Sequence, residues 1–337
     1  MKNPILLLTH AEDDSASMVG SKLEKIQVPY VRFNTEEFHR SIKIKLEFNK
    51  DGSFSGSYIF PELTLPFNDI AAVWNRRVHK PNICNEFNVE PELKQWIEDE
   101  TFGALNVSFT MFSCPIVNPW EANEKIKFNK MIQMKRAHEL GLDIPDTCIT
   151  NDLDEITKFF KKMDRNVIFK KIQKGIFNFK DGRRVLIHTN KIPPEMMTNE
   201  NIVRMRFSPV FLQRHIPKKY DIRSIVVGNK VFSVAIHSQD VAEGKIDFRT
   251  AAVLGKINQM KHERIELGKE VNSKLVAFTK SFGLTFGAID LILTPDDRIV
   301  FLEDNPNGQW GWLEILTGLD ISGAIAEHLA MLGGYHP

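Results

Sequence analysis

The chain has 337 residues, enough for two domains of ordinary size or three small ones. Its 44 lysines and arginines against 43 aspartates and glutamates leave a formal net charge of +1. That balance excludes a protein drawn by bulk charge to nucleic acid or to an anionic membrane. The longest uninterrupted apolar runs have four or five residues, too few to span a bilayer, and the N-terminus lacks the organisation of a signal peptide. We therefore expect a cytoplasmic protein with neither a nucleic-acid nor a membrane partner.

The first 120 residues alternate between apolar runs and helical periodicity, which predicts a compact α/β domain. Residues 5–8 form an unbroken apolar run that is typical of a buried parallel strand. Strict alternation over 42–48, then a turn at 49–52, predicts a hairpin with residues 54–59. The remaining expected elements are a helix after residue 13, strands at 29–33, 70–74 and 115–117, and a helix over 91–112.

Helical periodicity resumes at residue 122 and ends at Gly141, which suits a C-terminal cap. A second helix is expected over 153–163, followed by a strand at 167–171 whose return strand is 184–189. The loop between these strands, 173–183, carries basic and aromatic residues and is a candidate lid. The last third is rich in strands, with a long helix expected over 263–282 and a closing helix over 321–332.

A hairpin near the C-terminus carries the sharpest chemical signal. If its loop has two or four residues centred between Asp296 and Asp297, Asp290 pairs with Glu303. Alternation then places both carboxylates with Asn305, Ile292 and Phe301 on one face. Like charges opposite each other repel, so the pair needs a cation, and oxygen ligands suit Mg²⁺ or Mn²⁺. The alternative is a solvated strand end on which the two acids splay apart.

Single basic residues form the second signal. Neither a P-loop nor a GxGxxG pattern occurs in the chain, so phosphate binding would need separate cations. Taken one at a time, each of these residues is more often a solvated surface charge. The candidates are Lys130, Lys170, Arg223 and Arg249.

The order of these residues resembles the ATP-grasp superfamily and, within it, the graspetide maturases of the microviridin and plesiocin type. The resemblance covers residues 118–332 and extends more loosely to Trp74-Asn75-Arg76-Arg77 in the N-terminal part. The matching segments are Asn129-Lys130, Val167-Ile168-Phe169-Lys170, Phe211 to Ile216, Asp221-Ile222-Arg223, Asp247-Phe248-Arg249, Glu303 to Asn305 and Gly308-Gln309-Trp310.

The resemblance implies an α/β (α+β) ATP-grasp fold in three parts. A Rossmann-like pre-ATP-grasp domain would span 1–120, a central subdomain with the lid and the leader-peptide site 121–209, and a C-terminal subdomain with the metal site 210–337. Two departures from the family pattern stand out. Arg214 replaces a common glutamate, so backbone groups would have to contact the adenine amine, and Asp304 replaces an apolar residue and by alternation faces away from the metal.

The resemblance also implies a role for each candidate residue. Arg223 and Arg249 would lie near the acyl phosphate as catalytic residues. Asp290, Glu303 and Asn305 would hold two Mg²⁺ ions, with Mn²⁺ as a substitute. ATP would contact Lys130, Lys170, Gln213, Arg214, His215, Ile216 and Asp221.

Arg76 and Arg77 follow a strand of the first domain, where ligand crevices of α/β sheets form, so they are candidates for substrate binding. Alternation allows only one of them to face the cleft, and a surface salt bridge is an equal alternative.

The implied activity is ATP-dependent phosphorylation of Asp or Glu side chains in a ribosomally made precursor peptide, followed by closure of ester or amide macrocycles. The implied partner is a precursor with a leader segment and an acidic core, and the expected assembly is a homodimer. One alternative is a ligase of the glutathione-synthetase or tail-glutamylating type, which adds a free amino acid to a carboxylate. Another is a binding protein that has kept the fold and lost catalysis.

Overall fold

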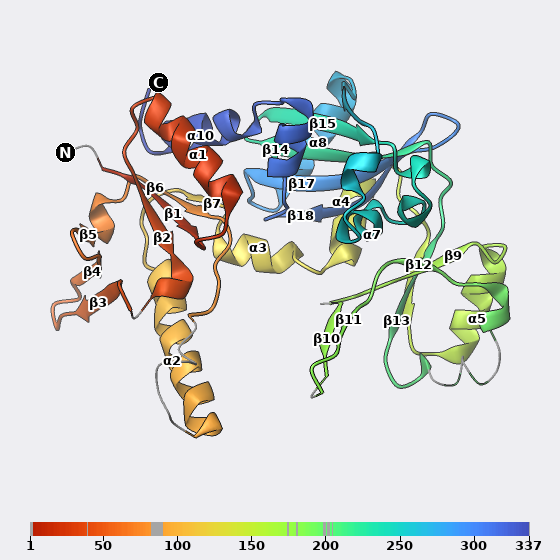
Figure 1. The fold of residues 1–337 in the computed structure, drawn as a ribbon, viewed down its shortest axis with the longest axis horizontal. Coiled ribbons are helices and arrows are strands. Elements are labelled where there is room, and N and C mark those ends of the chain that lie inside the picture. The colour runs from red at the N-terminus through yellow and green to blue at the C-terminus, as the bar shows by residue number, and fades with distance from the viewer. Residues whose placement is uncertain are drawn as a thin grey trace.

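The computed structural model describes residues 3–38, 40–81, 90–173, 175–179, 181–197, 200, 203 and 205–336. Within this part of the chain the strands form five sheets, distributed over an N-terminal, a central and a C-terminal region (Figure 1). Short 3₁₀ turns lie between the larger elements, at Thr35–Glu37, Phe67–Asp69, Pro194–Met196, Ser238–Asp240, Ala242–Gly244 and Ile257–Gln259. No helix in the described part is both long and apolar enough to cross a membrane.

The N-terminal region contains these elements: β1 (Ile5–Thr9), α1 (Asp14–Lys25), β2 (Tyr30–Asn34), β3 (Lys43–Phe48), β4 (Phe54–Ile59), β5 (Thr64–Pro66), β6 (Ala72–Asn75), α2 (Pro91–Phe109) and β7 (Ile116–Val117). A parallel sheet has the order β2-β1-β6-β7, and β1 is buried along its whole length. The predicted hairpin is confirmed as β3 and β4, and β5 adds a third strand.

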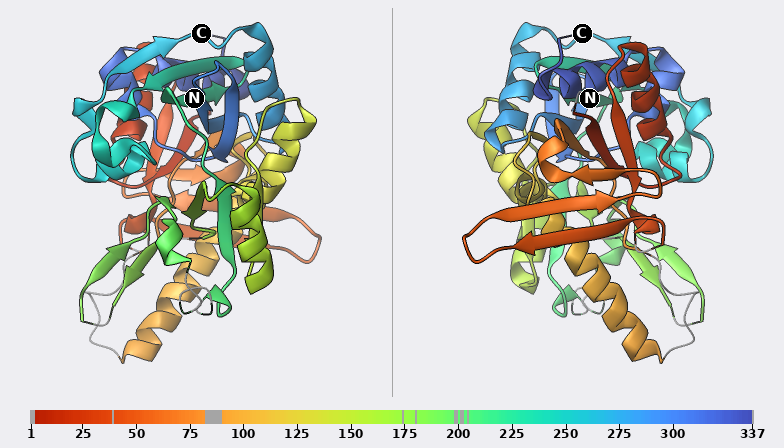
Figure 2. Two further views of the ribbon diagram at one scale, coloured as in Figure 1. Left: turned by 90° about the vertical axis from the view of Figure 1, so that its right-hand side faces the viewer. Right: turned by 90° about the vertical axis from the view of Figure 1, so that its left-hand side faces the viewer.

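The central region contains α3 (Trp120–Ile126), α4 (Lys130–Glu139), β8 (Thr147–Thr150), α5 (Leu153–Lys162), β9 (Val167–Lys170), β10 (Ile176–Asn178), β11 (Arg184–Leu186), β12 (Asn190–Lys191) and β13 (Val210–Arg214). Its antiparallel sheet has the order β12-β9-β13-β8. The expected pairing of residues 184–189 with 167–171 is wrong, because β11 pairs with β10 in a hairpin of its own and β9 pairs with β12 and β13. Figure 2 shows this hairpin and α2 extending in the same direction, away from the C-terminal sheet.

The C-terminal region contains β14 (Tyr220–Val227), β15 (Lys230–Ile236), α7 (Phe248–Val253), β16 (His262–Ile265), α8 (Lys269–Ser281), β17 (Phe286–Leu293), β18 (Ile299–Asn305), α9 (Gly311–Thr317) and α10 (Ile321–Leu332). Its sheet has the order β16-β15-β14-β17-β18. The helix expected from residue 263 begins only at Lys269, because 262–265 form the edge strand β16. Gly268, at φ +83°, breaks any helical path between the two elements.

The hydrophobic core joins the two ends of the chain. α1 packs on α10, and a single buried cluster contains Leu7 and Trp74 from the first sheet with Ile225 from the last. The central sheet has a smaller core of its own, in which Phe160 and Leu212 are buried. β13 belongs to this central sheet, although a boundary at residue 210 would assign it to the C-terminal part. The segment Gln213 to Ile216, which we call the hinge, begins at the end of β13 and connects two separately packed regions.

Candidate active site

The two acids of the predicted pair face each other on β17 and β18. Asp290 lies opposite Glu303 in the ladder, and both side chains are almost fully buried. The register nevertheless differs from the prediction near the turn. Thr294 and Arg298 close a loop centred on Asp296, and the ladder shifts by one residue between Asp290 and Leu291. The predicted pairing is confirmed, while the predicted loop of two or four residues is wrong.

The shift has a second consequence. Leu302 is the extra residue on β18, so side chains on either side of it change faces. Phe301 pairs with Leu291 and packs with Phe278 in the core, and it does not share a face with Glu303. Asp304 pairs with Ile289 and faces away from the acid pair, as predicted.

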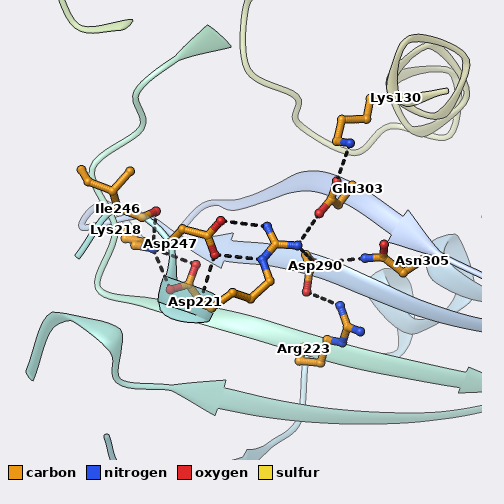
Figure 3. Close-up of polar contacts among 10 residues, drawn as sticks. Lys130, Lys218, Asp221, Arg223, Ile246, Asp247, Asp290, Glu303 and Asn305 are labelled. Atoms are coloured by element: carbon orange, nitrogen blue, oxygen red, sulfur yellow. Dashed lines mark hydrogen bonds and ion pairs between the residues drawn. The ribbon is translucent and has the colours of Figure 1, made fainter. Parts of the chain in front are cut away.

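Three cations hold the acid pair in place (Figure 3). An Arg249 nitrogen lies 2.6 Å from Glu303 Oε1 and 3.5 Å from Asp290 Oδ2. Lys130 Nζ lies 3.0 Å from Glu303 Oε2, and Arg223 donates to Asp290 Oδ1 at 2.7 Å. Burial by itself would raise the pKa of Glu303, but Arg249, Lys130 and the nearby Lys170 outweigh it and hold that pKa well below the ordinary value. Glu303 is therefore ionised, and positive charge from three side chains matches the acid pair.

Asp247 fixes the position of Arg249. Its two carboxylate oxygens accept from the guanidinium at 2.9 and 3.2 Å, and one of them also caps α7 by accepting from the Arg249 backbone N–H. Burial acts to raise the pKa of Asp247, yet the contacts with Arg249 lower it to about 2. The Asp-x-Arg spacing thus lets one carboxylate orient the arginine toward the acid pair.

The second Asp-x-Arg element is arranged differently. Asp221 accepts from Lys218 Nζ at 2.8 and 2.7 Å, and Lys218 also donates to the Ile246 carbonyl. Arg223 lies two residues further on β14 and reaches Asp290. Lys218 was not among the sequence candidates, since nothing in its local pattern sets it apart from the neighbouring Lys219.

A cleft connects the acid pair with the hinge. Its lining includes Lys170, Asp221, Arg249 and Asp290 together with the segment Gln213 to Ile216. Lys170 is buried, which lowers the pKa of its ammonium group. The cleft brings together all the predicted nucleotide residues except Lys130, which lies beside Glu303.

The hinge side chains differ in their surroundings. Gln213 is buried and donates to Thr147 Oγ1 at 2.9 Å, a contact that links the hinge to the neighbouring strand β8. Arg214 is exposed, and its guanidinium lies 3.8 Å from Asp146.

The two candidate substrate arginines have separate environments. Arg76 is 1% exposed and lies 3.4 Å from Asp13, and it donates to the Asn307 and Gly308 carbonyls and to Gln309 Oε1. Burial lowers its pKa to about 10. Arg77 is half-buried and has no side-chain partner among the described residues. Arg76 thus links the first sheet to the segment after β18, which leaves Arg77 as the member of the pair that is available to a ligand.

Two further residues that the sequence did not single out position the hairpin. Gln133 exchanges hydrogen bonds with the Asp304 backbone, accepting at 2.8 Å and donating at 3.0 Å. Asn118 donates to the carbonyls of Phe286 and Pro306 and accepts from Phe286 N. These amides fix β17 and β18 from two directions, and single glutamines and asparagines give no recognisable sequence pattern for such a role.

The oxygen donors suit a magnesium ion. Among the described residues no group of three or more His, Cys, Asp or Glu side chains could hold a metal. The two carboxylates and the Asn305 amide are instead the partial ligand set with which Mg²⁺ binds together with phosphates. The carboxylate oxygens contact Arg223, Arg249 and Lys130, and Asn305 donates to Asp290 Oδ2 through its side-chain nitrogen at 3.3 Å, so an ion would have to replace some of these contacts.

Comparison with protein families decides the family. A family model described as "RimK-like ATP-grasp domain" matches residues 122–329, and one described as "MvdD pre-ATP grasp domain" matches residues 4–124. The chain belongs to the RimK-like ATP-grasp family. The resemblance seen in the sequence is therefore confirmed, and with it the α/β ATP-grasp fold and the assignment as an ATP-grasp ligase.

Solved structures of two ATP-grasp enzymes are similar over nearly the whole chain. The macrocyclase MdnC of Microcystis aeruginosa, bound with precursor peptide MdnA, is 25% identical with a TM-score of 0.83, covering 97% of this chain and 99% of MdnC. A RiPP-associated ATP-grasp ligase of Chryseobacterium gregarium, in complex with ADP and a leader and core peptide, is 26% identical with a TM-score of 0.89, covering 99% and 98%.

A curated relative, the probable alpha-L-glutamate ligase of Pseudomonas entomophila, is 22% identical over 79% of this ATP-grasp chain and 85% of its own length.

Proposed function

We propose that the chain is a peptide macrocyclase that uses ATP to join side chains of a ribosomally made precursor. The observation that carries the proposal is the match at the N-terminus, residues 4–124, to the pre-ATP grasp domain of MvdD. It complements the similarity to MdnC and to the Chryseobacterium ligase, which extends over both the N-terminal and the ATP-grasp parts. The proposed substrate is a peptide with a leader segment and an acidic core.

The proposed reaction has two steps. An Asp or Glu carboxylate of the peptide attacks the γ-phosphorus of ATP, the bond to ADP breaks, and an acyl phosphate forms. A Ser or Thr hydroxyl or a Lys amine of the same peptide then attacks the acyl carbon, loses its proton and releases phosphate. Because the nucleophile is tethered to the same chain, its effective concentration is high and no pocket for a second substrate is required.

The buried charges supply the electrostatic support that this reaction needs. Lys130 and Lys170 are proposed to contact the ATP phosphates, and Arg223 and Arg249 to stabilise charge on the acyl phosphate. His215 and Ile216, with the backbone of Gln213 and Arg214, would bind the adenine, and Asp221 lines the same cleft. Arg77 is the proposed contact for the peptide.

Asp290, Glu303 and Asn305 are the proposed ligands of two Mg²⁺ ions, for which Mn²⁺ would substitute. When bound, these ions would offset negative charge on the phosphates. Arg249 lies between the two carboxylates and would turn toward the reacting phosphate once the acids are occupied. Homodimer formation, a cytoplasmic location and leader binding by residues 121–209 remain predictions that accompany this proposal.

A second candidate function is the addition of a free amino acid to a carboxylate. The relatives named probable alpha-L-glutamate ligase favour it, and they match 79% of the chain. The same phosphate chemistry would serve both functions, since they differ only in the origin of the nucleophile.

The test uses purified protein with ATP, Mg²⁺ and a candidate acidic peptide that contains Ser, Thr and Lys. Intact mass should fall by one water per ring, in an ATP-dependent way that Glu303→Ala abolishes. Hydrolysis of the product in alkali would then separate ester from amide rings. A mass gain on adding free glutamate would transfer the assignment to the second candidate. ATP binding with neither product, across several such peptides, would contradict both ligase functions.

A further inference from the structure

A basic pocket adjoins the acid pair outside the nucleotide cleft. It has a volume of about 300 Å³, and its lining includes Lys127, Lys130, Lys171, Arg249 and Glu303. None of the hinge residues lines it. A smaller cavity of about 260 Å³ shares Lys171 and Arg249 with this pocket, and Lys170 and Arg249 with the cleft. The pocket is therefore continuous with the phosphate end of the nucleotide site.

Most of the positive charge in this pocket is already matched. Lys127 pairs with Glu124 at 2.9 Å, Lys130 pairs with Glu303, and Arg249 pairs with both Asp247 and Glu303. Lys171 is the exception: among the described residues its ammonium group has neither an ion-pair nor a hydrogen-bond partner. The unmatched charge of the pocket thus lies on one side chain.

The backbone holds Lys171 in this position. Its aliphatic stem crosses Gly175 so closely that a Cβ there would lie 2.5 Å from Lys171 Cδ and 2.8 Å from the Ile187 carbonyl oxygen. Gly175 is buried, and its own carbonyl accepts from Ile187 N at 2.7 Å. The Lys171 side chain thus lies against Gly175 where it borders the pocket, and a larger residue at position 175 would displace it.

The two consecutive lysines share the smaller cavity, but Lys170 also lines the nucleotide cleft and Lys171 also lines the larger basic pocket. Lys170 ends β9 and is buried in the nucleotide cleft, whereas Lys171 is exposed and lines only the two cavities beside Glu303. Successive residues of an extended segment point to opposite sides, which explains how adjacent positions reach different ligands. Lys171 is therefore placed to bind an anionic group that approaches from outside the nucleotide cleft.

We propose that Lys171 binds the acceptor carboxylate of the substrate, an Asp or Glu side chain, in this pocket. The inference rests on the proposed function, because it specifies where the acidic core of the peptide enters. Lys171 forms no covalent bond in this step and is not consumed. It holds one carboxylate oxygen while the other attacks the γ-phosphorus, and ADP departs on the far side of that phosphorus.

The test measures binding rather than turnover. The probe is a hexa-glutamate peptide with a fluorescent label, titrated with the ADP- and Mg²⁺-loaded protein, and anisotropy reports its affinity. Lys171→Met should weaken probe binding by at least about tenfold, the size expected for one charge-assisted hydrogen bond. Lys171→Arg should restore most of the affinity, and Gly175→Ala should weaken it because the stem is displaced. ADP affinity should stay within about twofold of wild type in all three variants.

Lys191→Met is the matched control, since Lys191 is an exposed lysine of the same sheet that contacts Asn166 and lines neither cavity. Equal affinity of wild type and Lys171→Met, or an equal loss in Lys191→Met, would overturn the assignment. If Lys171→Met lost affinity for a non-hydrolysable ATP analogue but kept its affinity for the peptide probe, the assignment would also be overturned. The γ-phosphate would then be the ligand of Lys171. Lys171-dependent binding of the probe by a protein that forms no ring would uphold this assignment and contradict macrocyclisation.

Discussion

Arg249 contacts three carboxylates at once, so removing the arginine should destabilise the folded protein. Asp290 and Glu303 are 5% and 8% exposed at their side chains, so neither acid can recover full hydration. The arginine itself is 41% exposed, which moderates the effect. An unpaired buried carboxylate is among the strongest single causes of destabilisation.

Arg249→Met should therefore lower the free energy of unfolding by about 1–3 kcal/mol, less than for a fully buried pair. Mn²⁺ without nucleotide should then raise the melting temperature of the variant more than that of wild type, because the ion takes the place of the guanidinium between the acids. Thermal unfolding with and without Mn²⁺ measures both effects.

Arg298→Met is the control for that experiment, since Arg298 pairs with Asp296 and Asp143 at the exposed turn of the same hairpin. It should change the melting temperature little in either condition. An identical Mn²⁺ response in Arg249→Met and wild type would contradict the view that Arg249 occupies the metal ligands.

At the scale of elements, the hairpin β17–β18 shows what sequence reasoning could and could not reach. Alternation and a turn signal were enough to pair Asp290 with Glu303. They could not reveal that the loop is centred on Asp296 instead of between Asp296 and Asp297, or that Asp297 adopts a φ of +62°. Nor could they reveal that the extra residue Leu302 brings Glu303 back opposite Asp290. The two errors cancel at the acids and leave Phe301 on the opposite face.

The other errors have a similar origin. β11 was assigned to the wrong partner because strands of three or four residues carry too little pattern to specify a neighbour. The β16 strand was absorbed into a helix because its four residues alternate only briefly before Gly268. The supporting residues Lys218, Gln133 and Asn118 act through tertiary contacts that no local pattern records.

In the segment after β18, Gly308 lies close to Arg223. A Cβ at Gly308 would lie 2.5 Å from both Ala288 Cβ and an Arg223 guanidinium nitrogen, so Gly308→Ala should displace the arginine from Asp290. We expect a clear loss of both stability and ATP-dependent turnover, measured by thermal unfolding and ADP release.

Gly103→Ala provides the comparison. Gly103 lies within α2, and a Cβ at this position would have no neighbouring atom within 4 Å, so alanine there should stabilise the helix by roughly 0.5–1 kcal/mol. Wild-type turnover in Gly308→Ala would show that the close approach to Arg223 does not matter for the site.

At the scale of the whole molecule, the first sheet and the last share one core, and Arg76 reinforces that contact beside the active site. Its guanidinium connects Asp13 of the first region with the backbone at Asn307 and Gly308. The adjacent Arg77 makes no such connection among the described residues. Substitutions of these two neighbouring arginines should therefore have different effects on stability and on peptide binding.

Arg76→Met should lower stability by about 2–4 kcal/mol, because Asp13 and two carbonyls lose a buried partner. Arg77→Met should leave the melting temperature nearly unchanged and raise the KM for peptide, with ADP binding intact. Unfolding curves and steady-state kinetics on both variants separate the two roles. A melting temperature that falls equally in both variants would contradict the separation.

In the proposed reaction a peptide carboxylate is activated as an acyl phosphate, and oxygen isotopes test this activation most directly. The Asp and Glu carboxylates of a substrate peptide are labelled with ¹⁸O, and the phosphate released during ring closure is examined by ³¹P NMR. We expect one ¹⁸O atom in the released phosphate for every ring formed, since the attacking carboxylate oxygen leaves with the phosphorus. Ring formation that releases only unlabelled phosphate would contradict it.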